Sequence, residues 1–244
     1  GANVDVCAIR GNFDDAQTGV KKIFADASIA KELDEKGVFL SSANSINWGR
    51  LAPQIVYYVS AYCDLLAQGA IMPGEEIDVC VPTGNFGNIF AAYIAKLMGL
   101  PICRLVCASN RNNILTDFLR TGTYDRNRHF YTTMSPSMDI LISSNLERLL
   151  YTVAGAEKTA AYMRALGTDG KYTVDADVKA KIDESFLGYF CDEELTKKTI
   201  RDTFDTDHYL CDTHTAVGLA AARQYIAEHG GARKIVLAST ASPY

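Results

Sequence analysis

Hydrophobic and polar positions alternate along this chain with two different periods, and the period predicts which segments are strands and which are helices. Short apolar runs between turn residues predict strands at 4–9, 38–40, 77–81, 102–107, 209–211 and 234–238. Apolar residues three and four positions apart predict helices at 14–27, 29–36, 53–68, 86–98, 114–120, 144–154, 157–166, 177–186, 192–205 and 215–229. Strands that alternate with helices favour an α/β fold of three αβα layers, with helices on both faces of a mostly parallel sheet.

Three segments are predicted in more detail. Residues 77–107 are expected to form a right-handed βαβ unit, the usual way of joining two parallel strands. Gly37 is expected to end the helix before it, because glycine adopts the left-handed conformation easily. Residues 121–137 are polar and aromatic without a regular period, which predicts a loop.

The composition limits the classes of protein to which the chain can belong. With 244 residues, 48% of them hydrophobic, it is long enough for one large domain, alone or with a small appendage. The 24 basic and 29 acidic side chains give a net charge of −5 without a basic cluster, so no nucleic-acid partner is expected. The longest apolar runs are far too short to cross a bilayer, so no membrane partner is expected. Seven cysteines without Cys-x-x-Cys spacing argue against a disulfide framework and a zinc site, and favour the reducing cytoplasm.

The most informative stretch is the turn between the strand at 77–81 and the helix at 86–98, with the sequence Thr83-Gly-Asn-Phe-Gly-Asn88. Backbone N–H groups at such a turn, together with the helix dipole, form a phosphate-binding site. Gly84 and Gly87 are expected to permit positive φ and close approach of the phosphate. The loop lacks the Lys-Ser/Thr ending of a P-loop and the third glycine of a dinucleotide site. Taken alone, the Gly-x-x-Gly pattern fits a plain strand-to-helix connection equally well.

This hexapeptide resembles the phosphate loop of threonine synthase, a family of fold type II pyridoxal-phosphate-dependent enzymes with a tryptophan synthase β-like architecture. Further segments resemble the same family in the same order, at 11–17, 41–50, 109–115, 133–140, 144–150, 212–218 and 239–243. The resemblance runs nearly from end to end and is least distinctive over residues 155–200.

The resemblance implies pyridoxal 5′-phosphate as cofactor. Its phosphate is expected at the backbone N–H groups of Gly84, Asn85, Phe86, Gly87 and Asn88, where Asn88 stands in place of an aspartate found in many family members. The Thr240 hydroxyl resembles the group that contacts the pyridine nitrogen. A neutral hydroxyl does not hold that nitrogen fully protonated, so the ring is a weaker electron sink, suited to β- and γ-elimination or replacement. Without the resemblance, Thr240 is more simply interpreted as a hydroxyl that caps a turn.

Candidate substrate-binding residues lie in two segments. Asn44, Ser45, Asn47 and Arg50 follow the strand predicted at 38–40, and Thr213 and His214 directly precede the helix predicted at 215–229. Arg50 is the candidate partner for a phosphate or carboxylate of the substrate. The alternative is structural: serine and asparagine also cap helices, Trp48 also fits a core position, and a lone histidine at a helix start is usually satisfied locally. The segment Ser135–Asp139 resembles the family, but its sequence alone gives no physical account of its role.

The resemblance also implies an element that this sequence does not contain. The family attaches its cofactor through a lysine Schiff base, and no lysine here has that setting. The chain is therefore expected to be a C-terminal portion, with 1–40 as the remainder of a small domain and 41–244 as the large cofactor-binding domain. Association with the missing N-terminal part is the expected protein partnership.

The intact enzyme is expected to convert O-phospho-L-homoserine and water into L-threonine and phosphate, and this chain alone is expected to be inactive. The alternatives are another fold type II enzyme, such as a cysteine synthase or threonine dehydratase, or a homologue that only binds a ligand.

Overall fold

The computed structural model describes residues 3–11 and 13–244, which fall into two compact units divided between Ala43 and Asn44. The first unit contains helices α1 (Phe13–Ala25) and α2 (Ala27–Glu35). Gly37 follows α2 with a φ of +69°, as predicted. The strands predicted at 4–9 and 38–40 are wrong: both segments are irregular and exposed. A strand needs a neighbour for its backbone groups, and the described part of this unit contains none.

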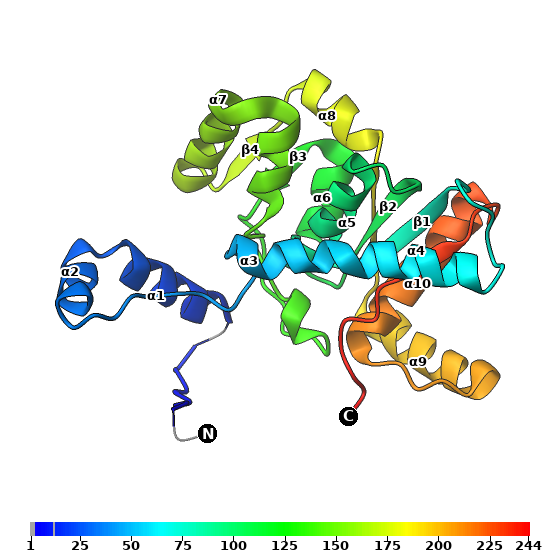
Figure 1. The fold of residues 1–244 in the computed structure, drawn as a ribbon, viewed down its shortest axis with the longest axis horizontal. Coiled ribbons are helices and arrows are strands. Elements are labelled where there is room, and N and C mark those ends of the chain that lie inside the picture. The colour runs from blue at the N-terminus through cyan, green and yellow to red at the C-terminus, as the bar shows by residue number, and fades with distance from the viewer. Residues whose placement is uncertain (1–2, 12) are drawn as a thin grey trace. The chain divides into compact units, whose positions relative to one another are not determined.

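The second unit contains a four-stranded parallel sheet with the order β5-β2-β1-β6 (Figure 1). The strands are β1 (Ile77–Pro82), β2 (Ile102–Ser109), β5 (Phe186–Phe190) and β6 (Ile235–Leu237). Val81 of β1 is in register with Cys107 of β2, and Val79 is in register with Val236 of β6. The strands predicted at 77–81, 102–107 and 234–238 are confirmed.

Helices surround this sheet. They are α3 (Trp48–Leu51), α4 (Ile55–Ala67), α5 (Gly87–Leu97), α6 (Ile114–Thr121), α7 (Leu146–Thr168), α8 (Ala176–Asp183), α9 (Glu193–Asp207) and α10 (Thr213–His229). The 3₁₀ turns η1 (Ala52–Gln54) and η2 (Pro136–Met138) complete the connections. No helix among the described residues is long and apolar enough to span a bilayer.

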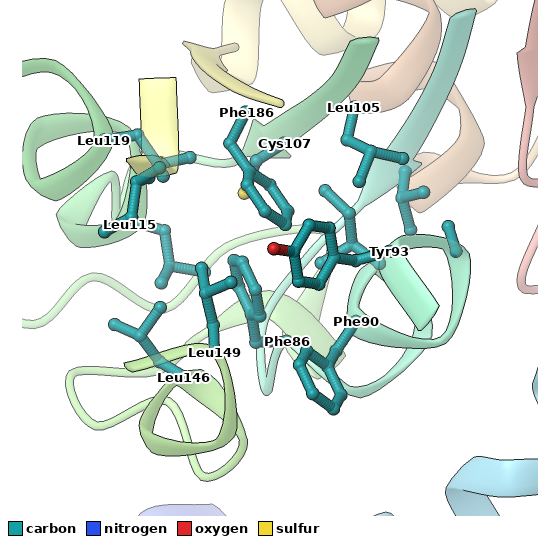
Figure 2. Packing of buried hydrophobic residues seen from close by; sticks show 14 of the residues in the cluster. Phe86, Phe90, Tyr93, Leu105, Cys107, Leu115, Leu119, Leu146, Leu149 and Phe186 are labelled. Atoms are coloured by element: carbon teal, nitrogen blue, oxygen red, sulfur yellow. The ribbon is translucent and has the colours of Figure 1, made fainter. Parts of the chain in front are cut away.

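Two hydrophobic clusters lie on opposite faces of the sheet. Because side chains alternate along a strand, β1 contributes to both: Val79 belongs to the cluster that includes α5, and Cys80 to the cluster that includes α10. In the first cluster, Phe86 and Tyr93 pack against Phe186, with ring centroids 5.6 and 5.1 Å apart (Figure 2). The predicted α/β fold with a mostly parallel sheet is confirmed.

Several predicted boundaries need correction. The helix predicted at 177–186 ends at Asp183, and β5, which was not predicted, follows it. The predicted loop contains β3 (Thr123–Asp125), which pairs antiparallel with β4 (Lys171–Thr173). The strand predicted at 209–211 is irregular. The break predicted between helices 144–154 and 157–166 occurs within α7 at Gly155, whose φ is +82°.

Candidate functional site

The loop from β1 to α5 turns at Phe86, which has a φ of +61° and precedes the first residue of α5. Its ring is buried in the core, which anchors the turn (Figure 2). The positive φ expected at Gly84 and Gly87 is therefore wrong. The two glycines are needed for close packing instead: a Cβ on Gly84 would lie 2.7 Å from the Ser137 carbonyl oxygen, and one on Gly87 would lie 2.8 Å from Ser45 Cβ.

The N-terminus of α5 differs from those of α9 and α10. The carboxylates of Asp192 and Asp212 accept hydrogen bonds from the first turns of α9 and α10, but no side chain caps α5. Within the described chain, nothing accepts a hydrogen bond from the five consecutive backbone N–H groups of residues 84–88. Unpaired donors of this kind, at the positive end of a helix dipole, form a site for an anion.

Two carbonyl groups of the same loop, those of Gly84 and Asn85, accept hydrogen bonds from residues 143–145. The Ser143 hydroxyl donates to the Gly84 carbonyl at 2.8 Å. The Asn85 carbonyl accepts from the Asn145 backbone N–H at 3.1 Å and from Asn145 Nδ2 at 2.9 Å. Asn145 Oδ1 is buried and has no hydrogen-bond partner among the described residues. Residues 143–145 were not predicted as site residues, although segment 144–150 contributed to the family resemblance.

A cavity of about 610 Å³ is lined by the end of β6 and by the residues that follow it, Ala238, Ser239 and Thr240. In an open α/β sheet, ligands bind beyond the carboxyl ends of the strands. The cavity brings together three predicted site residues, Arg50, Asn88 and Thr240. Two lining residues that sequence reasoning missed contact Asn88. Tyr58 donates a short hydrogen bond to Asn88 Oδ1, and Gln54 Oε1 accepts from Asn88 Nδ2 at 2.9 Å.

The segment from Asn44 to Arg50 is largely built by local hydrogen bonds. Asn44 Oδ1 accepts from the Ile46 N–H at 3.1 Å, and Asn47 caps α3 through the Gly49 N–H at 2.9 Å. The capping interpretation therefore holds for Asn47. The segment reaches the phosphate loop through Ser45, whose Cβ lies against Gly87.

Trp48 is not a core residue. Its side chain is 47% exposed, and the Arg148 guanidinium lies 5.5 Å from its ring centroid. Arg148 also donates to the Ile46 carbonyl at 2.6 Å, which ties the segment to the start of α7. The core interpretation of Trp48 is therefore wrong.

Thr213 and His214 lie at the start of α10 and do not line the cavity. The Thr213 hydroxyl donates to the Met134 carbonyl at 2.7 Å. Asp212 Oδ1 accepts from the His214 backbone N–H at 2.8 Å and lies 3.2 Å from His214 Nδ1. His214 Nε2 is buried without a hydrogen-bond partner in the described part of the chain. Thr215, next in α10, lies 3.0 Å from Ser239 between their hydroxyl oxygens, which places this helix start near the end of β6.

The segment Ser135–Asp139 has a structural explanation. Asp139 Oδ1 accepts hydrogen bonds from Asn110 Nδ2 and the Thr133 hydroxyl, at 2.8 and 2.7 Å. Asp139 Oδ1 also accepts from Asn112 Nδ2 at 2.9 Å, and Asp139 Oδ2 accepts from the Thr133 N–H at 2.9 Å. This buried carboxylate therefore holds the loop whose Ser137 carbonyl packs over Gly84.

No lysine of the described second unit lines the cavity. Lys96 instead donates to the Cys103 carbonyl at 2.6 Å, near the start of β2. Nor do His, Cys, Asp and Glu side chains of the described residues form a group that could hold a metal ion.

Comparison with known proteins agrees with this arrangement, although no family model matches the chain. Threonine synthase-like 1 of Homo sapiens is 47% identical over 219 residues, which cover 88% of this chain and 29% of that protein. The threonine synthase of Pseudomonas aeruginosa is 41% identical over 226 residues, which cover 92% of this chain and 46% of that protein.

A crystal structure of pyridoxal-phosphate-bound threonine synthase from Brucella melitensis superposes with a TM-score of 0.82 at 40% identity. The match covers 96% of this chain and 48% of that one. The chain thus spans less than half the length of each of these relatives. Over the part of those proteins that it spans, the chain belongs to the threonine synthase family.

Proposed function

We propose that this chain supplies the phosphate-holding part of a pyridoxal-phosphate-dependent threonine synthase. The whole enzyme would convert O-phospho-L-homoserine and water into L-threonine and phosphate. The observation that carries this proposal is the row of five unpaired backbone N–H groups at residues 84–88 of the described chain, at the N-terminus of α5, which no side chain caps. An uncapped helix start with free donors favours a permanent anionic ligand.

The residues present fit pyridoxal 5′-phosphate. The N–H groups of Gly84, Asn85, Phe86, Gly87 and Asn88 would hold its phosphate, since the loop carbonyls of Gly84 and Asn85 are already engaged by residues 143–145. Thr240 lines the cavity that Asn88, the last residue of this row, also lines, and would hydrogen-bond to the pyridine nitrogen. When bound, the cofactor supplies an electron sink for the bonds that break at the substrate carbons.

The chain's own residues would bind and orient rather than transfer protons. The Thr240 hydroxyl is neutral and would leave the ring nitrogen without a full proton, which favours elimination and replacement chemistry. Arg50, which lines the cavity, would pair with an anionic group of the substrate. Asn44, Ser45 and Asn47 lie in the same segment but do not line the cavity. Of these three, Ser45 lies against Gly87 and would contact an anion at the start of α5.

Thr213 and His214 have a weaker case as substrate contacts, because they do not line the cavity. We propose that Thr213 acts through Met134, whose carbonyl accepts from the Thr213 hydroxyl, and that His214 acts only through its contacts with Asp212. The start of α10 would in this way hold the loop that packs on Gly84.

The lysine that attaches the cofactor would come from outside this chain, since no lysine of this sequence has the setting that the family resemblance implies. In the described second unit, no lysine lines the cavity. The chain alone would therefore not make threonine and would need the rest of a family member. The division into the remainder of a small domain (1–40) and a large domain (41–244) is part of this proposal, and the change of compact unit after Ala43 supports it. All seven cysteines are unpaired, which supports a cytoplasmic location.

The test is to add pyridoxal 5′-phosphate to the purified chain and record visible absorption before and after borohydride reduction and dialysis. We expect reversible binding that dialysis removes and borohydride does not fix. Pyridoxal, which lacks the phosphate, is the matched control and should bind far more weakly. Cofactor that borohydride attaches covalently to one particular lysine would contradict the proposal that the chain alone is inactive. Equal binding of pyridoxal 5′-phosphate and pyridoxal would contradict the proposed phosphate site.

A second candidate is a homologue that binds the ligand without catalysis. One relative with 47% identity is named "Threonine synthase-like 1" and not threonine synthase, so this alternative is tested as well. A lysine-bearing full-length version should be assayed with O-phosphohomoserine, O-acetylserine and threonine. Threonine formation from O-phosphohomoserine alone favours threonine synthase; turnover of either other compound favours another fold type II enzyme. No turnover, with ligand bound, favours the binding protein.

A further inference from the structure

A continuous chain of hydrogen bonds runs along one wall of the cavity, from α4 to the segment before α3. The Tyr58 hydroxyl donates to Asn88 Oδ1, and Asn88 Nδ2 donates to Gln54 Oε1 at 2.9 Å. Gln54 Nε2 donates to the Arg50 carbonyl at 2.7 Å and to Ser45 Oγ at 3.4 Å. We call Tyr58, Asn88 and Gln54 the relay.

The direction of the relay is fixed by the Arg50 carbonyl. A backbone carbonyl only accepts hydrogen bonds, so Gln54 must turn its amide nitrogen toward Arg50 and its oxygen toward Asn88. Asn88 must then present its own nitrogen to Gln54 and its oxygen to Tyr58. The Tyr58 hydroxyl is thereby required to donate, and its hydrogen bond holds the Asn88 amide in the position that keeps Gln54 beside Ser45.

Tyr58 is well suited to remain a donor. Its side chain is only 4% exposed, and burial raises the pKa of its phenol, so the hydroxyl keeps its proton. Because the Tyr58 hydroxyl keeps its proton and donates it to Asn88, the donor–acceptor direction of this hydrogen bond does not change with pH.

The other end of the relay lies beside the phosphate loop. Ser45 Oγ accepts from Gln54 Nε2 and lies 2.9 Å from the position that a Cβ on Gly87 would take. A serine hydroxyl that accepts from one side has its own proton available for another acceptor. That proton is therefore available to an anion at the start of α5.

We propose that the relay sets the Ser45 hydroxyl as a donor to the phosphate, so that Tyr58 and Gln54 are positioning residues for phosphate binding. This inference rests on the proposed function. It also assigns a role to asparagine at position 88. An aspartate there offers only acceptors, so Gln54 would have to flip and place its own oxygen against the Arg50 carbonyl.

The test is calorimetric titration of the chain with pyridoxine 5′-phosphate and with pyridoxine, which lack the aldehyde that reacts with surface lysines. The variants are Tyr58→Phe, Gln54→Met and the double variant. Each single variant should weaken binding of pyridoxine 5′-phosphate about tenfold or more, as expected for the loss of one hydrogen bond to a charged group. Binding of pyridoxine should not change. The double variant should lose little more than one single variant, because both act through the same relay.

Tyr62→Phe is the matched control, because Tyr62 lies one turn along α4 and is also buried. Its hydroxyl contacts the turn at Gly74 and Glu75 instead of the loop. It should change thermal stability without changing the preference for the phosphate ester. Unchanged binding in both single variants, an equal loss for pyridoxine, or additive losses would each overturn the relay. If the unmodified chain shows no preference for the phosphate ester, the proposed function fails instead.

Discussion

Ser45 and Gly87 are in such close contact that a methyl group on the glycine would lie 2.8 Å from Ser45 Cβ. The two residues come from segments that are far apart in the sequence, and together they bring a hydroxyl to the N-terminus of α5. The glycine is therefore required for this approach and not for its backbone conformation, since its φ is not positive.

Replacing Gly87 with alanine should displace Ser45 and lower both stability and phosphate affinity. The cost of overpacking such a contact is about 1–3 kcal/mol. Urea unfolding and titration with pyridoxine 5′-phosphate measure the two effects. The double variant Gly87→Ala with Ser45→Gly should recover part of the lost stability, because the pair is in contact. Gly167→Ala, where a methyl group meets nothing within 4 Å, is the control and should be neutral or stabilising.

Asp139 should be essential to the loop that covers Gly84. In Asp139→Asn, an amide nitrogen replaces one carboxylate oxygen and faces donors, either the Thr133 N–H or the side chains that donate to Oδ1. We expect a loss of about 2–3 kcal/mol in the free energy of unfolding, the cost of unsatisfied buried polar groups. Urea unfolding is the measurement. A loss below about 0.5 kcal/mol would mean that the loop is held mainly by other contacts.

The sequence predicts the strongly patterned parts of this fold and misses the parts that depend on tertiary contacts. β1 and β2 are mostly apolar because both faces of the sheet are covered, each with one charged residue near its start, Asp78 and Arg104, and their prediction is confirmed. β5 was missed because Gly188 interrupts its run. In the structure that glycine is required, since a Cβ there would lie 2.9 Å from Thr116 Cα.

The same limit applies to the site. The loop at residues 83–88 could be located because a strand, a turn and a helix follow one another in the sequence. Tyr58 and Gln54 could not be identified, because a tyrosine and a glutamine near the start of an amphipathic helix have no distinctive pattern. Their role depends on α4 crossing the start of α5, which only the fold specifies.

The Asp212 carboxylate, which caps the start of α10, should make a contribution to the free energy of unfolding that depends on pH. Burial favours a higher pKa for Asp212, but hydrogen bonds from Thr215 and His214 outweigh it and lower the pKa below its usual value. A carboxyl whose pKa is lower in the folded state stabilises the protein above the unfolded-state pKa and loses this effect as pH falls through the folded-state pKa. Asp212→Asn should therefore be less stable than the unmodified chain at pH 7, and the gap should close below about pH 4. Urea unfolding from pH 7 to pH 3 tests this; a constant gap would contradict it.

The cysteines should differ strongly in reactivity. Cys7 and Cys63 are exposed, whereas Cys80 and Cys107 are buried. Burial raises the pKa of Cys107 to about 12 and also raises that of Cys80, so their thiolate forms are scarce at pH 8. Brief treatment with iodoacetamide, followed by peptide mass spectrometry, should label the first pair and leave the second pair unmodified. Rapid labelling of Cys80 would mean that the sheet opens readily.

β6 is only three residues long, yet it pairs Val236 with Val79 and carries Thr240 to the cavity. During synthesis on the ribosome, the phosphate loop emerges long before this last wall of the cavity. A nascent chain that stops short of β6 would have the anion site exposed at the edge of a three-stranded sheet. Ligand capture is therefore expected only after β6 and Thr240 have left the exit tunnel.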